Sequence, residues 1–153
     1  MPRIHLDRLP QLARRLQRFV KKVRRRLPVD RVIMHGSAAR GDLTESSDID
    51  LVFIGHFPQR WLDRHRPISD LVPAYLPVEF FCYNPEEFEQ GLARGNPFLQ
   101  DVKKWGRELT GDEPLELRHR GQEREERTKA LRSRRPARQK PRQQRRTVES
   151  GRA

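Results

Sequence analysis

The sequence predicts a small α/β (α+β) domain, and three observations support that fold class. A helix with one apolar face opens the chain, three short apolar runs follow it, and segments with helix signals separate or follow these runs. At 153 residues the chain has room for one ordinary domain. We therefore expect one hydrophobic core built from a few strands and several helices.

Charge divides the chain into three parts. Residues 1–28 carry ten basic and one acidic side chain, residues 29–117 nine and sixteen, and residues 118–153 fourteen and four. Metal sites need clustered carboxylates, whereas polyanions are bound by Arg and Lys. This pattern predicts a basic N-terminal helix that packs on the domain, a catalytic domain over 29–117, and a basic, largely disordered tail over 118–153.

The first helix is predicted from about Leu6 to Leu27. Its apolar residues recur at steps of three and four and therefore share one face: Leu9, Leu12, Leu16, Phe19, Val20, Val23 and Leu27. The opposite face is basic. Pro28 ends the helix, because proline disfavours the helical conformation of the residue before it.

Three strands are expected, at 31–35, 48–54 and 77–83, because each run is apolar and rich in β-branched or aromatic residues. Residues 59–76 predict one or two short helices. Asn84-Pro85-Glu86-Glu87 is a typical helix start, with an N-cap residue, an N1 proline and acidic residues at the positive end of the helix dipole.

A second helical segment begins after Gly95-Asn96-Pro97, and the folded body is expected to finish near 110–111. From residue 118 onward large apolar side chains are almost absent. This composition predicts a frayed helix to about Arg132 and disorder beyond it.

The single cysteine, Cys82, excludes an intramolecular disulfide and a zinc site made of cysteines from this chain alone. The five histidines show no metal-ligand spacing, and no apolar run approaches the roughly 20 residues that a transmembrane helix needs. We therefore expect a cytoplasmic protein that has no membrane as a partner.

One segment, residues 35–42, carries the pattern of a phosphate-binding turn. A strand that enters Gly36-Ser37 and leaves as a short helix presents backbone N–H groups and the Ser37 hydroxyl at a positive dipole end. Arg40, one helical turn later, can contact the same anion. The alternative for Arg40 is an exposed ion pair with Asp42 or Glu45.

Asp48 and Asp50 lie two residues apart on the second strand, so their carboxylates leave the same face of the sheet. Glu79, in the third strand, is the candidate for a third carboxylate if that strand pairs near Asp50. Three carboxylates held together would repel one another without a counter-ion. The pattern therefore indicates divalent cations, and oxygen ligands suit Mg²⁺.

These residues resemble the minimal, single-domain branch of the DNA polymerase β-like nucleotidyltransferase superfamily, whose signature is Gly-Ser, about ten residues, and then Asp-x-Asp. Ten residues, 38–47, separate Ser37 from Asp48 here. The resemblance covers roughly 29–111. It implies the polymerase β-like fold, a small mixed sheet flanked by helices.

The resemblance also implies a chemistry, with two Mg²⁺ ions and ATP as the substrate. Gly36 and Ser37 would grip the triphosphate, while Asp48 and Asp50 would bridge the metal ions. Glu79, where the family usually has Asp, would hold the catalytic metal and help to deprotonate the attacking hydroxyl. Minimal members typically act as antitoxins that attach AMP to a tyrosine of a HEPN-domain partner.

The expected function is therefore Mg²⁺-dependent transfer of AMP from ATP to a hydroxyl of a partner protein. One alternative acceptor is an RNA end or a small hydroxylated molecule, with the basic tail binding nucleic acid. Another alternative is a catalytically silent antitoxin that neutralises its partner by contact alone, which Glu79 in place of Asp favours. The tail itself is read equally well as a solubilising extension.

Overall fold

The computed structural model describes residues 2–133 and 151, and the chain divides into two units, residues 1–122 and 123–153. Nearly all of helix α6 (Gln122–Ser133) lies in the second unit, and the helix has no buried residue. The helix predicted to extend to about Arg132 is thus confirmed, whereas the disorder predicted beyond it falls outside the described residues. No helix in this described part has both the length and the apolar character needed to cross a bilayer.

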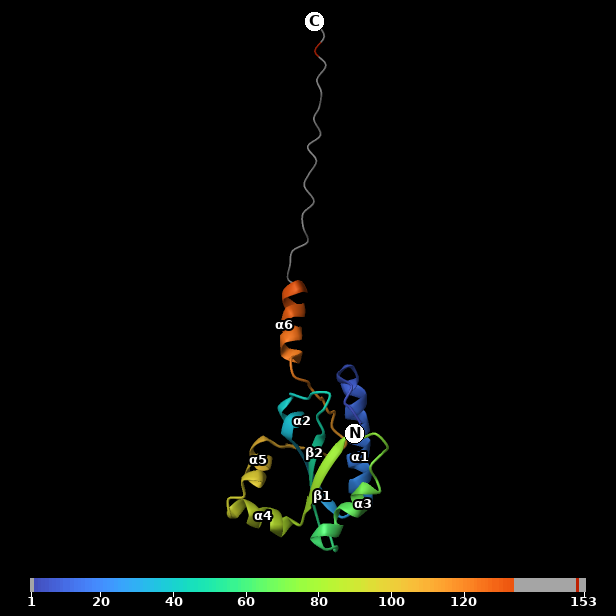
Figure 1. Ribbon diagram of the computed structural model, residues 1–153, viewed down its shortest axis with the longest axis vertical. Coiled ribbons are helices and arrows are strands. Elements are labelled where there is room, and N and C mark those ends of the chain that lie inside the picture. The colour runs from blue at the N-terminus through green and yellow to red at the C-terminus, as the bar shows by residue number, and fades with distance from the viewer. Residues whose placement is uncertain (1, 134–150, 152–153) are drawn as a thin grey trace. The chain divides into compact units, whose positions relative to one another are not determined.

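The first unit contains one mixed sheet with the strand order β3-β2-β1-β4 (Figure 1). The strands are β1 (Val29–His35), β2 (Ile49–Gly55), β3 (Val78–Tyr83) and β4 (Arg107–Glu108). Strand β1 is antiparallel to β2 and β4, while β2 and β3 are parallel. The three predicted strands are confirmed, but β4 was missed because two exposed, charged residues carry no apolar pattern.

Helices cover both faces of the sheet. On one side lie the short helix η1 (Leu6–Arg8), α1 (Leu9–Arg26) and α3 (His65–Ser69), and on the other α4 (Pro85–Ala93) and α5 (Pro97–Trp105) (Figure 1). Two further short helices, α2 (Gly36–Arg40) and η2 (Trp61–Asp63), follow β1 and β2. The apolar face of α1 is buried as predicted, so this helix packs on the sheet.

Alternation along the strands builds a core on each face. Val32, Met34 and Leu51 belong to the core under α1, whereas Ile33 and Val52 belong to the core under α4 and α5. Because both faces are covered, the strands read as almost continuous apolar runs. Where β1 ends and β2 begins, this second face carries His35 and Asp50 in place of apolar residues, and this change marks the candidate site.

The folded body continues past residue 111, so the predicted end near Thr110-Gly111 is wrong. Leu115 and Leu117 pack against the core under α1. The Leu43 N–H donates to the Arg118 carbonyl at 3.3 Å, and the Leu43 carbonyl accepts from the Arg120 N–H at 3.0 Å. Because the few leucines of residues 112–120 stand among charged residues, the sequence carries no clear signal that this segment packs on the body. Its hydrogen bonds hold the loop between α2 and β2 in place.

A half-buried ion pair anchors the start of α4. The Arg64 side chain is 8% exposed and makes two contacts with Glu87, Nη1 to Oε2 at 2.5 Å and Nη2 to Oε1 at 3.0 Å. Glu87 Oε2 also accepts from the Asn84 N–H at 2.9 Å, which completes the predicted N-terminal cap. The hydrogen bond from Arg64 is the main cause that lowers the pKa of Glu87.

We expect Glu87→Gln to lower the free energy of unfolding by about 2 kcal/mol at pH 7, because it leaves the buried Arg64 charge unpaired and Glu87 is itself partly exposed. Since folding lowers the pKa of Glu87, its contribution is present at neutral pH and is lost as the pH falls below 4.5. Urea titrations should therefore show the two chains converging in acid. Glu86→Gln, at an exposed neighbouring position, should change stability by less than about 0.5 kcal/mol.

Candidate active site

Strand register places three of the site's side chains in one row. In the β1–β2 pair His35 lies opposite Asp50, and in the β2–β3 pair Asp50 lies opposite Glu79. Residues paired across strands project from the same face, which here is the face covered farther along by α4 and α5. The structure therefore brings Asp50 and Glu79 together as neighbours, and Asp48 precedes β2 two residues before Asp50.

The turn after β1 is in direct contact with Asp50. Gly36 has a φ of +66°, and a Cβ built on it would lie 2.3 Å from Asp50 Oδ2 and 3.3 Å from its Cγ. Glycine is required here both for the left-handed backbone and for the space. This contact joins the predicted phosphate-binding turn to the predicted metal ligands.

The carboxylate of Asp50 is held in an unfavourable electrostatic environment. Burial raises its pKa most, the charge of Asp48 raises it further, and Arg40 acts in the opposite direction. Ionised Asp50 is therefore destabilising when no cation is bound. A cation bound between Asp48 and Asp50 would offset that cost.

Across residues 2–133 and 151, no group of three His, Cys, Asp or Glu side chains is arranged so that it could hold a metal ion. Asp48, Asp50 and the exposed Glu79 nevertheless supply only carboxylate oxygens, which Mg²⁺ prefers. Their donor chemistry and the mutual repulsion of Asp48 and Asp50 fit such an ion. Their role as metal ligands stays a prediction.

Arg40 is exposed, and its Nε lies 3.5 Å from Asp42 Oδ2, which is the ion pair that we considered as an alternative. Its charge still lowers the pKa of both His35 and Asp50. Ser37 is half-buried, and its carbonyl accepts from the Asp42 N–H at 3.0 Å. Contact of Arg40 and Ser37 with phosphate stays a prediction.

His35 belongs to the site, although sequence reasoning assigned it no chemistry. Its Nε2 is buried without a hydrogen-bond partner in the described structure, and its ring packs edge-to-face on Phe98 at 5.2 Å. Burial and then Arg40 lower its pKa, so the imidazole is neutral at pH 7. The available signal was its position, since it directly precedes Gly36 at the end of a strand.

Two known proteins are similar to parts of this chain. The chain is 36% identical over 64 residues to a protein of Methanocaldococcus jannaschii named a putative protein adenylyltransferase, and this match covers 40% of the chain and 44% of that protein. The chain thus spans less than half the length of that relative. A solved structure described as a putative nucleotidyltransferase from Sulfolobus solfataricus shows 25% identity and a TM-score of 0.44, over 56% of this chain and 75% of that one.

The family described as the nucleotidyltransferase domain matches residues 16–129, which is most of the chain. That range contains the last part of α1 and every later element of the sheet and its helices, from β1 to β4. It also contains the Gly36-Ser37 turn and the row of Asp50 and Glu79. The chain therefore belongs to the nucleotidyltransferase domain family.

Proposed function

We propose that this nucleotidyltransferase carries out Mg²⁺-dependent transfer of AMP from ATP to a hydroxyl group of a partner protein. The observation that carries the proposal is the Asp50 carboxylate, which lies against Gly36 and beside Glu79. A phosphate-binding turn and acidic metal ligands must lie this close for nucleotidyl transfer. The name of the M. jannaschii relative supports a protein as the acceptor.

The proposed reaction is a single in-line displacement. The acceptor oxygen forms a bond to the α-phosphorus while the bond from that phosphorus to the α,β-bridging oxygen breaks, and pyrophosphate leaves. Glu79 takes the proton of the acceptor hydroxyl. Gly36 and Ser37 bind the triphosphate, and Asp48 and Asp50 hold Mg²⁺, which supplies neutralisation of charge on the phosphates.

The proposed partner is of the HEPN type, with a tyrosine as the acceptor. This part of the proposal rests on the resemblance to minimal nucleotidyltransferases and on the size of the body. Residues 1–122 form one compact unit that contains the site. We propose that another molecule presents the acceptor hydroxyl to it.

Incubation with α-labelled ATP, Mg²⁺ and the product of the adjacent gene should label that product and release one pyrophosphate per AMP attached. The Asp48→Asn, Asp50→Asn double variant should produce no label, because it removes two of the proposed metal ligands. Equal labelling by the parent chain and the double variant would refute the proposal.

A short RNA added to the same reaction tests the second acceptor class, which the basic outer face of α1 favours. We expect label on the protein and none on the RNA. Label on RNA alone would keep the nucleotidyltransferase reaction and move the acceptor to nucleic acid. Binding of ATP with no label on any acceptor would instead favour the catalytically silent module.

A further inference from the structure

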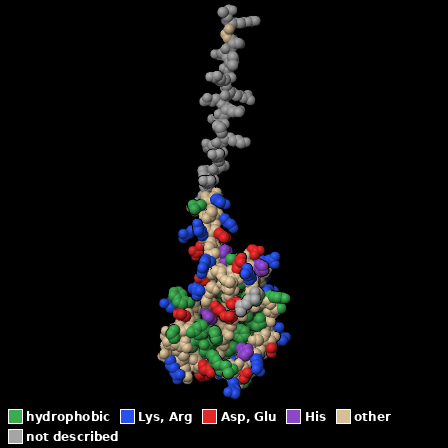
Figure 2. All heavy atoms as spheres, viewed as in Figure 1, with side chains coloured by type: hydrophobic (Ala, Val, Ile, Leu, Met, Phe, Trp, Pro, Cys, Tyr) green, Lys and Arg blue, Asp and Glu red, His purple; other side chains and the backbone are tan. Residues whose placement is uncertain are grey.

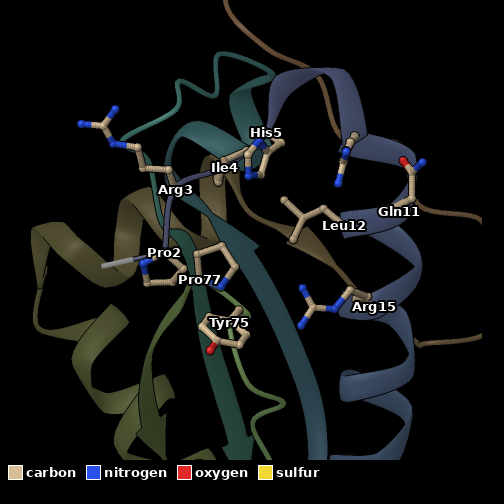
Figure 3. Close-up of a pocket in the computed structure, with 10 residues that line it drawn as sticks. Pro2, Arg3, Ile4, His5, Gln11, Leu12, Arg15, Tyr75 and Pro77 are labelled. Carbon is tan, nitrogen blue, oxygen red and sulfur yellow. The ribbon is translucent and has the colours of Figure 1, made fainter.

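A pocket of about 670 Å³ lies between the N-terminal segment, the first turns of α1 and the loop before β3 (Figure 3). Its size falls within the range of sites that bind small molecules or a few side chains. Ile4, Leu12 and Pro77 form apolar parts of its wall, and arginine side chains lie on both sides of the opening in Figure 3. None of the residues that line it belongs to the candidate active site.

The pocket is nevertheless bonded to the segments that carry the acidic residues. The Ile4 N–H donates to the Glu45 carbonyl at 2.9 Å, in the loop that leads to Asp48. The Pro77 carbonyl accepts from the Ile49 N–H at 2.7 Å, and Pro77 lies two residues before Glu79. A molecule bound in the pocket would thus lie beside the strand that bears the proposed catalytic base.

The lining is strongly basic. Arg3, His5, Arg8 and Arg15 all contribute, and no Asp or Glu among residues 2–133 and 151 lines the pocket. Within the described chain Arg3 makes no ion pair or side-chain hydrogen bond, and Arg8 has only the exposed Asp7 at 3.9 Å. A cluster in which cations outnumber acidic groups raises the local concentration of anions.

Tyr75 stands at the rim of this pocket in a strained conformation. Its φ is 64°, and no other non-glycine residue in the described ranges has a positive φ. The residue is 82% exposed. Such strain is typical of functional positions. Arg15 Nη2 donates to the neighbouring Ala74 carbonyl at 2.6 Å and so supports this loop.

The surface beyond Glu79 favours a polypeptide over a nucleic acid. Strand β3 is an edge strand, and in the described sheet no strand pairs with its outer side. Phe81 is 50% exposed on this strand and lies with Trp61 and Leu62 along a second hollow of about 330 Å³. Figure 2 shows hydrophobic side chains gathered on this face of the body. An open strand edge beside apolar side chains suits an extended protein segment.

We propose that the basic pocket binds an acidic segment of the protein that receives AMP, and that this contact places the acceptor hydroxyl next to Glu79. The inference rests on the proposed function, since it names the chemistry of that partner. Charge complementarity supplies the attraction, and continuity with the open edge of β3 leads the bound segment toward the site. Arg3, Arg8 and Tyr75 determine specificity and take no part in the chemical step.

Fluorescence anisotropy with a labelled octaglutamate peptide tests the pocket directly. Arg3→Glu, Arg8→Glu should weaken binding by about 10-fold, because it reverses two exposed charges at the opening. Arg18→Glu, Lys22→Glu changes the net charge equally on the exposed face of α1, away from the pocket, and should weaken it by less than about 3-fold. Equal losses in the two variants would overturn the inference, because general charge would then explain the binding.

Tyr75→Gly provides a variant that should not impair folding, because glycine adopts a φ of 64° without strain. We expect it to unfold at or above the parent temperature and to bind octaglutamate about 3-fold more weakly. If neither pocket variant changes peptide binding, or if the parent chain does not bind the peptide, the inference is wrong. A labelled octauridylate provides a further test. The inference would also be wrong if this RNA bound the parent chain more tightly than the peptide does and its binding were lost in the Arg3→Glu, Arg8→Glu variant.

The same variants separate this inference from the proposed function. Binding of octaglutamate requires no catalysis, so intact peptide binding without labelling of any partner would count against the proposed function alone. Labelling of the partner with an unchanged acceptor KM in the Arg3→Glu, Arg8→Glu variant would count against the pocket alone. If both proposals hold, the acceptor KM rises about 10-fold while the KM for ATP is unchanged.

Discussion

An Asp50→Asn variant is expected to lose nucleotide transfer and, without divalent cations at neutral pH, to unfold at a higher temperature than the parent chain. Transfer should fall at least about 100-fold, because the amide cannot replace a carboxylate beside a metal-bound phosphate. The melting temperature should rise by roughly 2 °C, because asparagine removes a charge that burial and Asp48 disfavour. Scanning calorimetry and pyrophosphate release measure the two effects on the same preparation.

The stability difference between Asp50→Asn and the parent chain should depend on pH. Folding raises the pKa of Asp50, so its contribution to stability is fully present below its ordinary value of 3.8 and is lost as the pH rises through the folded value. The advantage of asparagine should therefore shrink as the pH falls. Mg²⁺ should stabilise the parent chain and have little effect on the variant.

Asp101→Asn, at an exposed position of α5, is the matched control and should leave activity and melting temperature unchanged. A destabilised Asp50→Asn protein would show that the carboxylate makes favourable contacts which the structure does not contain. A fully active one would remove Asp50 from the proposed metal ligands.

Gly36→Ala should have the second large effect, with a loss of about 3 kcal/mol in the free energy of unfolding and loss of transfer. Two costs add at this position. The φ of +66° disfavours any side chain, and the new methyl group would lie 2.3 Å from Asp50 Oδ2. The carboxylate must therefore move away from the turn, and the site opens.

Gly95→Ala separates these two costs. Gly95 has a φ of +76°, but its nearest contact for an added Cβ is Gln100 Nε2 at 3.8 Å. The Gly95→Ala variant should lose only the conformational part of the free energy of unfolding, about 1 kcal/mol, and should keep its activity. In urea titrations the excess loss at Gly36 measures the contact with Asp50.

A double-mutant cycle then assigns that excess. Asp50→Ala removes the carboxylate that meets the new methyl group, so adding Gly36→Ala to it should cost about 1 kcal/mol less than adding it to the parent chain. Strict additivity of the two substitutions would mean that Gly36 and Asp50 are not in contact, and the geometry proposed for the site would fail.

Local patterns predicted most of the elements. The apolar period of the first helix, the three apolar runs and the Asn84-Pro85 helix start each depend on residues close together in the chain, and each was confirmed. The same reasoning missed β4 and ended the body too early at residue 111. Those segments are held by distant partners, β1 for Arg107 and Glu108, and the core under α1 for Leu117.

The candidate site shows the same division. The spacing of Gly36, Asp48 and Asp50 is local, so the sequence indicated that they work together. The inclusion of Glu79 was conditional on pairing near Asp50, and the parallel register of β2 and β3 places it there. His35 and the basic pocket had no local signature at all, because their surroundings come from residues that are far apart in the chain.

Residue order alone therefore decided most of the segments that become helices and strands and which residues are candidates for the chemistry, because periodicity, turn residues and charge act over a few positions. The tertiary structure decided the order of the strands, the contact of Gly36 with Asp50, and the pocket that Arg3 and Arg15 share with Tyr75. These features depend on which distant segments pack together. That choice is made by burial of the whole core, which no short stretch of sequence contains.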